Sequence, residues 1–275
     1  SESIVQELFY GRWRSQTVYA GLRLGAFEAL TDVPADVGKV TADLGVDREL
    51  GARLLRALTS LGLLVEDDGP AYALAAAGQL LKGDHPKSMR DAFLLREGPE
   101  HTAVWKHLAD IVRSGEQNGF VREFGVPAFE HAARDRTYGD AFNAGMSSQS
   151  NLQTAWTLEA LSTVEFVSAE HVCDIGGGHG HLLSHLLREH AHLHGTVFDR
   201  SSVIERSDQS WAQRLGVEAR CQYLAGDMFI DVPVADVYLM KMILHDWNDD
   251  ECKQILRMLA LRGAGGARLF IVEHV

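Results

Sequence analysis

Residues 172–180 read Val-Cys-Asp-Ile-Gly-Gly-Gly-His-Gly, a short β-type run that passes into glycines and then into a helical run over residues 182–188. A ligand can approach the backbone of such a loop closely because glycine has no Cβ. The N–H groups at the start of the following helix favour an anionic or polar ligand. Glycines are also common in tight turns for steric reasons. The spacing of the glycines and the residues around them must therefore indicate whether this loop binds a ligand.

The spacing separates two kinds of nucleotide loop. The dinucleotide fingerprint requires G-x-G-x-x-G, but His181 stands where its last glycine would be. The pattern D-x-G-x-G-x-G is complete, with Asp174, Gly176, Gly178 and Gly180 at its fixed positions. This second pattern is similar to the loop of proteins that bind S-adenosylmethionine, and it favours that cofactor over NAD.

The hydrophobic period differs between the two halves of the chain. Up to about residue 161 apolar residues recur at helical spacing, which predicts a mostly helical first half, and the apolar face of residues 105–112 predicts a helix packed against a core. From residue 171 onward short β-type runs alternate with helical stretches, which is typical of a parallel sheet with helices on its faces. The predicted strands cover residues 171–175, 195–199, 220–224, 236–244 and 268–273.

Acidic side chains follow the second and third predicted strands. Asp199 ends the second strand, at the spacing at which an acid meets the ribose hydroxyls of an adenosine, although it could instead cap the next helix. Asp227, Met228 and Phe229 follow the third strand, where they could offer an adenine one acceptor and two apolar walls. Core packing is the alternative for the two apolar residues. Ligands of open α/β sheets bind at the carboxyl ends of the strands, so these groups are well placed for one.

The fourth predicted strand leads to a candidate base. Over residues 236–247 strand alternation places Lys241 and His245 on one face, with His245 at the carboxyl end. A phenol has a pKa near 10, and a histidine that takes a proton from such a hydroxyl contributes roughly 10²- to 10⁴-fold to a reaction rate. Glu273, after the fifth strand, could accept a hydrogen bond from His245 and fix its tautomer. Each of these residues has a structural alternative: Lys241 could form an ion pair, His245 could be a structural histidine and Glu273 could be a solvated acid. Asp246 fits the turn before the next helix.

Residues 24–74 show a distinct pattern within the mostly helical first half. Three short helices, the third over residues 47–61, precede a hairpin over residues 63–74, and together they form a winged helix-turn-helix. Its acidic hairpin tip, Glu66, Asp67 and Asp68, would repel a phosphate, so DNA binding is disfavoured.

Charge and composition exclude several further classes of protein. The formal net charge of -12 argues against a nucleic-acid or anionic-membrane partner. No apolar run approaches the roughly 20 residues of a membrane-spanning helix. Cys173, Cys221 and Cys252 lack a paired spacing and the N-terminus lacks an export signal, so we expect a reducing cytoplasm. The histidines between residues 171 and 194 contain no H-E-x-x-H, and we expect no metal site.

With its glycine loop, Phe198-Asp199, Gly226-Asp227-Met228-Phe229 and Leu244-His245-Asp246-Trp247, the chain resembles the S-adenosylmethionine-dependent small-molecule O-methyltransferases of the caffeic-acid and bacterial polyketide-tailoring type. The resemblance covers nearly the whole chain. It implies an α/β fold, with a Rossmann-like sheet that binds S-adenosylmethionine, preceded by a mostly helical winged-helix domain that forms a homodimer. The implied domains are a dimerisation domain (1–90), a connecting and substrate-pocket segment (91–161) and a cofactor-binding α/β domain (162–275).

The functional positions of that family fall on particular residues of this sequence. Its catalytic base falls on His245, and one of its two flanking acids falls on Glu273. A position that lines the phenolic substrate falls on Met146, although core packing would also explain this residue. The expected reaction is methyl transfer from S-adenosylmethionine to a hydroxyl of a small aromatic substrate, without a metal. The implied cofactor contacts are Ser150, which could also be a plain helix-surface serine, Gly176, Gly178, Asp199, Asp227, Met228, Lys241 and Trp247.

The sequence departs from this family at its end. It stops at Val275, just after the fifth predicted strand, whereas the family continues through a helix and two further strands that complete the sheet and supply the second flanking acid. A fragment and a naturally short protein both fit. A relative diverted to non-methylating chemistry, a winged-helix regulator and an inactive binding protein are the competing hypotheses.

Overall fold

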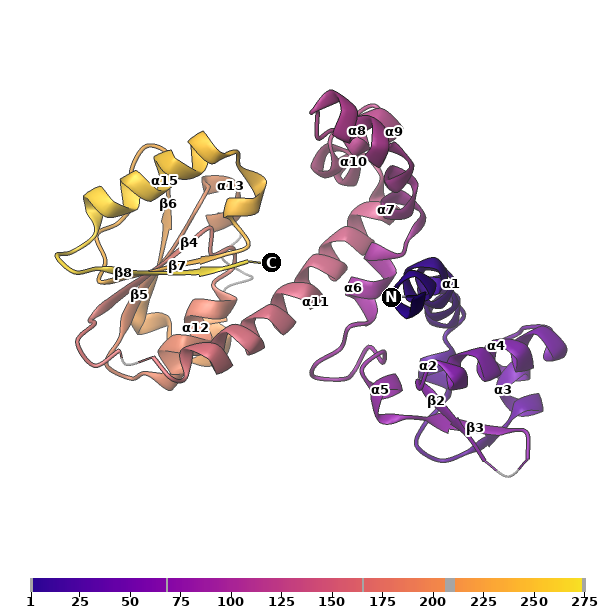
Figure 1. Ribbon diagram of the computed structural model, residues 1–275. Helices are drawn as coiled ribbons and strands as arrows, with labels where there is room; N and C mark the ends of the chain where they lie inside the picture. The colour runs from indigo at the N-terminus through magenta and orange to yellow at the C-terminus, as the bar shows by residue number, and fades with distance from the viewer. Residues whose placement is uncertain (1, 68, 165, 206–210, 274–275) are drawn as a thin grey trace. The chain divides into compact units, whose positions relative to one another are not determined.

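The computed structural model describes residues 2–67, 69–164, 166–205 and 211–273, and it divides into two compact units (Figure 1). The first unit ends at Leu152 and the second begins at Gln153. Each unit has hydrophobic clusters of its own, which is what allows a chain segment to fold as a separate domain.

The first unit begins with helix α1 (Glu2–Leu24), and the predicted winged helix, with three shorter helices of its own, follows it. Three helices and an antiparallel sheet of strand order β1-β3-β2 surround a core that includes Phe27, Leu58 and Tyr72. Asp47 caps its third helix by accepting from Leu50 N at 2.9 Å, so the predicted start of that helix is confirmed. Asp68, predicted at the acidic hairpin tip, lies outside the described residues. The elements are α1 (Glu2–Leu24), α2 (Ala26–Ala29), β1 (Ala35–Asp36), α3 (Val37–Asp43), α4 (Arg48–Ser60), β2 (Leu64–Glu66) and β3 (Ala71–Leu74).

Short helices follow, and the long helix α11 carries the chain into the second unit. They are α5 (Ala76–Gln79), α6 (Arg90–Arg96), α7 (Pro99–Val104), a 3₁₀ turn (Trp105–His107), α8 (Leu108–Ser114), α9 (Gly119–Phe124), α10 (Ala128–Arg134) and α11 (Arg136–Leu161). The prediction that residues 105–112 face a core is wrong. Trp105, Leu108 and Val112 are exposed and line a surface groove of about 450 Å³, because helical periodicity identifies an apolar face but not what covers it.

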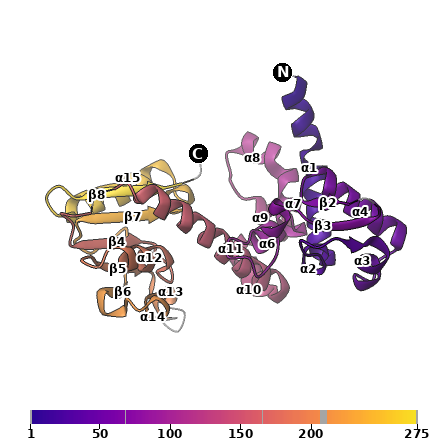
Figure 2. The same cartoon turned by 90° about the horizontal axis from the view of Figure 1, so that it is seen from below.

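The second unit contains the predicted parallel sheet. All four neighbouring strand pairs are parallel, and the strand order is β6-β5-β4-β7-β8, as Figure 2 shows. Side chains alternate between two faces, so α12 packs on one face and α15 on the other (Figure 1). The elements are β4 (His171–Ile175), α12 (His181–Glu189), β5 (His194–Asp199), α13 (Ser201–Ile204), α14 (Trp211–Leu215), a 3₁₀ turn (Glu218–Arg220), β6 (Cys221–Ala225), β7 (Val237–Lys241), a 3₁₀ turn (Leu244–Asp246), α15 (Asp249–Arg262) and β8 (Arg268–Val272).

The register brings the strand ends together. Ile175 pairs with Phe198, Asp199 with Ala225, and Lys241 with Val272, so the carboxyl ends of the five strands meet at one edge of the sheet. The fourth strand ends at Lys241 rather than at the predicted residue 244. This edge is where an open α/β sheet binds its ligand.

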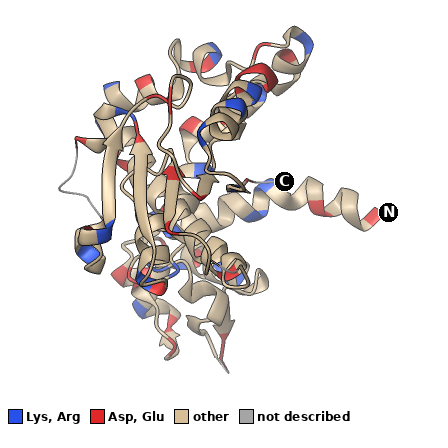
Figure 3. Ribbon diagram, turned by 90° about the vertical axis from the view of Figure 1, so that its left-hand side faces the viewer, with Lys and Arg blue, Asp and Glu red and all other residues tan. Residues whose placement is uncertain are grey.

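Acidic and basic residues are interspersed over the described ribbon of both units (Figure 3). Among the described residues, every helix is too short or too polar to cross a membrane.

Candidate active site

The loop after β4 is built for glycine. Gly176, Gly178 and Gly180 have φ values of 68°, 59° and 77°, a left-handed region that side chains disfavour. A Cβ at Gly176 would lie 2.2 Å from Ile243 Cδ1, and one at Gly180 would lie 2.5 Å from the hydroxyl of Tyr223. A Cβ at Gly178 would meet no described atom within 4 Å, so this part of the loop is open. The loop therefore offers bare backbone to a ligand beside the amino end of α12.

Asp199 holds this loop. One carboxylate oxygen accepts from Gly178 N at 2.9 Å, and the other accepts from Arg200 N at 2.7 Å. The alternative role as a helix cap fails, because the residue at the cap position of α13 is Arg200. A carboxylate offers about four lone-pair sites, so Asp199 can hold the loop and still accept from two ribose hydroxyls.

Asp227 lies next to Asp199 at the strand ends. Gly226 N donates to the Asp199 carbonyl at 2.9 Å, and the Asp227 carboxylate accepts from Phe229 N at 2.9 Å. The ring of Phe229 meets that of Trp247 edge to face, with centroids 4.7 Å apart. Met228 and Phe229 also pack against the core cluster under α15, so the core-packing interpretation is confirmed, and their contact with an adenine stays a prediction.

Asp174 is a buried acid beneath the loop, and the sequence motif gave its side chain no role of its own. Burial raises its pKa to about 7, the Lys241 ammonium opposes that rise, and Asp199 adds to it. Burial likewise lowers the pKa of Lys241, and Asp174 counteracts this. Lys241 thus stands at the end of β7, where its charge and that of the buried Asp174 carboxylate partly offset the effect of burial on each other.

His245 and Glu273 form a hydrogen-bonded pair. His245 Nδ1 lies 2.7 Å from Glu273 Oε2, while Glu273 Oε1 accepts from the N–H groups of Ile243 and Leu244 at 2.9 and 2.8 Å. Burial raises the pKa of Glu273, but the hydrogen bonds and charge of His245 and those two N–H groups outweigh it and hold the pKa below its usual range. Glu273 is therefore a fixed carboxylate that orients the imidazole.

The predicted strand alternation up to His245 is wrong. Met242 has a φ of 59°, which ends β7, and His245 lies in the 3₁₀ turn that follows. Asp246 is in that turn, as expected, and its Oδ1 also lies 3.4 Å from His245 Nε2. Because Ile243 packs on Gly176, this turn covers the glycine loop and brings the histidine near the ligand edge.

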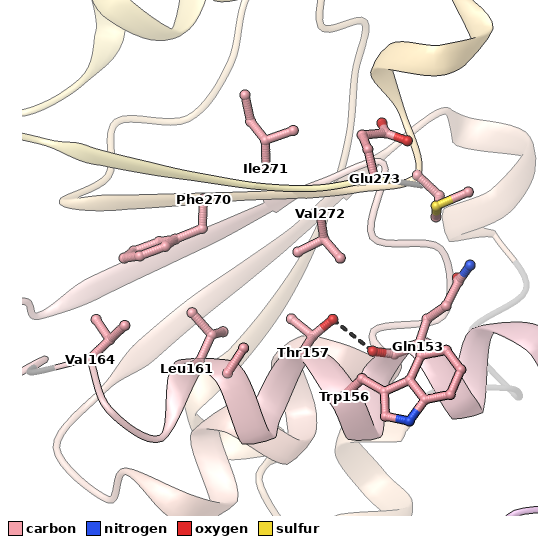
Figure 4. Close-up of a pocket in the computed structure, with 11 residues that line it drawn as sticks. Gln153, Trp156, Thr157, Leu161, Val164, Phe270, Ile271, Val272 and Glu273 are labelled. Atoms are coloured by element: carbon pink, nitrogen blue, oxygen red, sulfur yellow. Dashed lines mark hydrogen bonds between the residues drawn. The ribbon is translucent and has the colours of Figure 1, made fainter. Parts of the chain in front are cut away.

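An apolar pocket of about 430 Å³ lies beside the pair. Its walls come from the last turns of α11 and from β8, and Glu273 and Met242 stand at one end. Figure 4 shows Phe270 and Val272 pointing towards Thr157 and Leu161 of α11, with Ile271 and Glu273 on the other side of the strand.

Two predicted site residues lie on α11 within the first unit. Met146 is partly exposed and Ser150 is half-buried. Among the described residues, no group of three or more His, Cys, Asp or Glu side chains is arranged to hold a metal. His181 and His185, the i,i+4 pair, pack ring to ring with Trp211, and burial lowers the pKa of His181 to about 4.

Sequence reasoning missed Tyr223. Its hydroxyl donates to the His179 carbonyl at 2.9 Å and abuts Gly180, which fixes the loop from β6. No local pattern signals this contact, since the two residues are 44 positions apart.

Fold and site together define an α/β enzyme that binds an adenosine-type ligand, with a histidine–carboxylate pair beside its binding edge. The chain belongs to the family of S-adenosylmethionine-dependent O-methyltransferases: residues 105–275 match the O-methyltransferase domain and residues 6–84 match the O-methyltransferase dimerisation domain. S-adenosylmethionine is the cofactor of this family, and the glycine loop and the acids at the strand ends fit it.

Several individual proteins are similar over nearly the whole chain. The phenazine O-methyltransferase PhzM of Lysobacter antibioticus is 30% identical over 274 residues, which is 99% of this chain and 79% of that protein. The mitomycin biosynthesis 6-O-methyltransferase of Streptomyces lavendulae is 29% identical, over 100% of this chain and 78% of that one. Among solved structures, the calicheamicin-biosynthesis methyltransferase CalO1 with bound S-adenosylhomocysteine has a TM-score of 0.86 at 26% identity, and covers 98% of this chain and 79% of its own.

Proposed function

We propose that this methyltransferase acts on the hydroxyl of a small aromatic substrate, with His245 as general base. The observation that carries the proposal is the His245–Glu273 hydrogen bond of 2.7 Å, beside the loop that fits the cofactor. S-adenosylmethionine supplies an electrophilic methyl group bound to its sulfonium sulfur.

The geometry supports separate roles for the His245 and Glu273 side chains. Glu273 stays ionised because its pKa lies below its usual range, so Nδ1 donates to it and the lone pair of the neutral imidazole is left on Nε2. Nε2 takes the proton of the substrate hydroxyl, the oxygen forms its bond to the methyl carbon, and the carbon–sulfur electron pair leaves with S-adenosylhomocysteine. Proton removal by a placed imidazole contributes roughly 10²- to 10⁴-fold.

The cofactor is held, in this proposal, by residues at the strand ends. The glycine loop at Gly176 and Gly178 receives its methionine part, Asp199 accepts from the ribose hydroxyls, and Asp227 accepts from the adenine. Met228 and Trp247 line the adenine, while Lys241 and Ser150 contact the methionine end.

The relatives support an aromatic substrate. Proteins similar to this chain are named for phenazine and for 3-amino-4-hydroxybenzoate, the second from Streptomyces cremeus. We infer that the substrate is likewise a hydroxylated ring system, lined by Met146.

The first unit supports a homodimer, since residues 6–84 match a dimerisation domain. The described cysteines are free thiols, Cys173 and Cys221 are buried, and a reducing cytoplasm therefore suits the protein.

The proposal is tested by incubating the protein with methyl-labelled S-adenosylmethionine and a panel of hydroxyphenazines, hydroxybenzoates and hydroxyindoles. We expect labelled methyl ether from at least one ring class, together with S-adenosylhomocysteine. Label on nitrogen or carbon alone, or cofactor binding with no transfer to any hydroxyl, would contradict the proposal.

A further inference from the structure

Asp174 is a buried acid that the proposed reaction does not use. The residue is only 2% exposed, and it lies near the carboxyl end of β4, the middle strand of the sheet (Figure 2). The glycine loop passes directly over it, since a Cβ at Gly177 would lie 2.8 Å from Asp174 Oδ2. A carboxyl group in such a place has lost most of its hydration, so its ionisation depends strongly on the other charges around it.

The register of the sheet places two further charges on the same face as Asp174. Asp174 pairs with Val197 of β5 and with Leu239 of β7, and Asp199 and Lys241 follow these partners by two residues. Side chains two residues apart point to the same side of a strand, and Val197 and Leu239 pack in the cluster under α12. Strands about 4.8 Å apart with a rise of about 3.3 Å per residue place each of these two Cα atoms roughly 8 Å from that of Asp174. Asp174 therefore lies between the acid proposed to hold the ribose and the lysine proposed to contact the methionine end.

Asp174 is also the member of this group that changes charge near neutral pH. Burial raises its pKa to about 7, although the ammonium group on β7 opposes this rise. The other titratable groups nearby stay neutral at that pH. Burial raises the pKa of the Cys221 thiol on β6 to about 11, raises that of the Cys173 thiol on β4 as well, and lowers that of His181 at the start of α12 to about 4. A charge bound at the strand ends thus acts on Asp174 rather than on these neighbours.

The cofactor and its product differ by one charge. Both contain the adenosine and the amino and carboxylate groups of the methionine part, but only S-adenosylmethionine carries a positive sulfonium, whereas the sulfur of S-adenosylhomocysteine is neutral. A unit charge roughly 8–10 Å away changes a protonation equilibrium roughly 10- to 30-fold at an effective dielectric constant of about 20. The sulfonium therefore favours the ionised form of Asp174, and the product sulfur does not.

We propose that Asp174 makes the site prefer S-adenosylmethionine to S-adenosylhomocysteine: its carboxylate is ionised while the sulfonium is bound, and it takes up a proton from solvent when the neutral product occupies the site. The cofactor then gains one charge–charge attraction that the product lacks, which favours replacement of the product by new cofactor. This inference rests on the cofactor contacts of the proposed function. It depends neither on the identity of the methyl acceptor nor on His245 as the base.

The sign of the pH dependence follows from this linkage. A ligand that lowers the pKa of Asp174 releases a proton when it binds, so its affinity rises with pH. Because that pKa is about 7 in the free protein, binding of S-adenosylmethionine at pH 7 should release about 0.4–0.5 proton through Asp174, whereas S-adenosylhomocysteine should release none through it. The dissociation constant of the product, divided by that of the cofactor, should rise about five- to eightfold between pH 6 and pH 8.

Isothermal titration of the full chain with each ligand tests the inference. Titrations at pH 7 in buffers of different ionisation enthalpy count the released protons in the unchanged protein, and titrations at pH 6, 7 and 8 give the ratio of dissociation constants. Asp174→Asn has the shape of the protonated acid, so its ratio should stay within about twofold over this range. His245, the other titratable group at this edge, is retained in that variant, so any protons that it exchanges are measured there and subtracted.

Glu170→Gln is the matched control. It removes one negative charge from the exposed amino end of β4, and it should behave like the unchanged protein. Far-UV circular dichroism checks that both variants are folded. The proton count in the unchanged protein decides the question even if Asp174→Asn does not fold.

Two results would overturn the inference. One is equal proton release with the two ligands in the unchanged protein, and the other is a folded Asp174→Asn variant that keeps the pH-dependent ratio. Neither bears on methyl transfer to a hydroxyl, since these titrations contain no acceptor. A protein that released the expected protons but methylated no hydroxyl would refute the proposed function and leave the role of Asp174 standing.

Discussion

Asp199 illustrates how one side chain can shape a site and serve it. Its carboxylate accepts from Gly178 N and Arg200 N, so it fixes the loop whose open backbone suits the cofactor. We therefore expect the ligand to meet a preformed site, in which little ordering cost offsets the contacts it makes.

Replacing Asp199 with alanine should raise the dissociation constant of S-adenosylmethionine about 10- to 100-fold. Hydrogen bonds to a charged group are worth about 1.5–3 kcal/mol, and the loop also loses its anchor. Isothermal titration with S-adenosylmethionine and S-adenosylhomocysteine measures the change. The exposed Glu189→Ala at the end of α12 is the control, and equal affinity in the two variants would refute the assignment of Asp199.

Glu273→Gln tests the carboxylate behind the base. The amide keeps the shape of Glu273 but cannot stabilise an imidazolium, so we expect the rate of methyl transfer to fall about 10- to 1,000-fold with little change in cofactor affinity. Stopped assays at saturating cofactor supply the rate. If the variant turned over as fast as the unchanged protein, Glu273 would be a structural acid that ties down the turn after β7.

The loop after β4 and the turn after β7 pack against each other at the candidate site. The glycine loop can exist because its residues adopt left-handed backbone, and the turn after β7 packs Ile243 directly against Gly176. This packing links the histidine turn to the loop.

Gly176→Ala and Gly178→Ala separate backbone strain from steric conflict. Both residues are left-handed, so each alanine should cost about 1–2 kcal/mol of unfolding free energy. The Cβ at Gly176 also meets Ile243 at 2.2 Å, which should add roughly 1–3 kcal/mol, whereas that at Gly178 meets no described atom within 4 Å. Urea denaturation measures both, and equal losses would show that Ile243 moves aside freely.

In the first unit, α7 and α11 meet through a half-buried histidine. His101 Nε2 lies 3.1 Å from the Tyr138 hydroxyl, and burial, with the charge of Arg96, lowers the pKa of His101 to about 4. The unfolded chain, with an ordinary pKa near 6.5, binds a proton between pH 6.5 and 4 that the folded chain does not. The free energy of unfolding is therefore at its full value above pH 6.5 as far as His101 is concerned, and it falls as the pH falls from 6.5 to 4.

His101→Gln should remove this pH dependence. After allowance for solvent screening, we expect the unchanged protein to lose about 1–2 kcal/mol more than the variant between pH 7.5 and pH 4.5. Urea unfolding at the two pH values gives the difference. The exposed His194→Gln should behave like the unchanged protein, and a His101→Gln variant that did so too would contradict the shift.

Across the whole molecule, the sequence predicted what local pattern controls. The glycine spacing, the five parallel strands and the winged helix follow from periodicity and residue type over short windows, and the structure contains all three. The positions of Asp199, Asp227 and Glu273 at one edge of the sheet could be predicted because strand ends are recognisable and parallel strands share an edge.

The features that could not be predicted depend on partners distant in sequence or on uncommon backbone. Met242 has a left-handed backbone conformation although it is not glycine, so its residue type could not predict that β7 ends before His245. Tyr223 and Asp199 reach the glycine loop from other strands. The exposure of Val112 could not be predicted either, because an apolar helix face has the same periodicity whether or not the chain itself covers it.

The most direct test of the central claim is the single-turnover rate of methyl transfer by His245→Ala, with both cofactor and an accepted phenolic substrate saturating. The account predicts a rate about 10²- to 10⁴-fold below that of the unchanged protein, while the dissociation constant of S-adenosylmethionine from calorimetry stays within about twofold. A rate within about twofold of the unchanged protein would show that the histidine beside Glu273 is not the base.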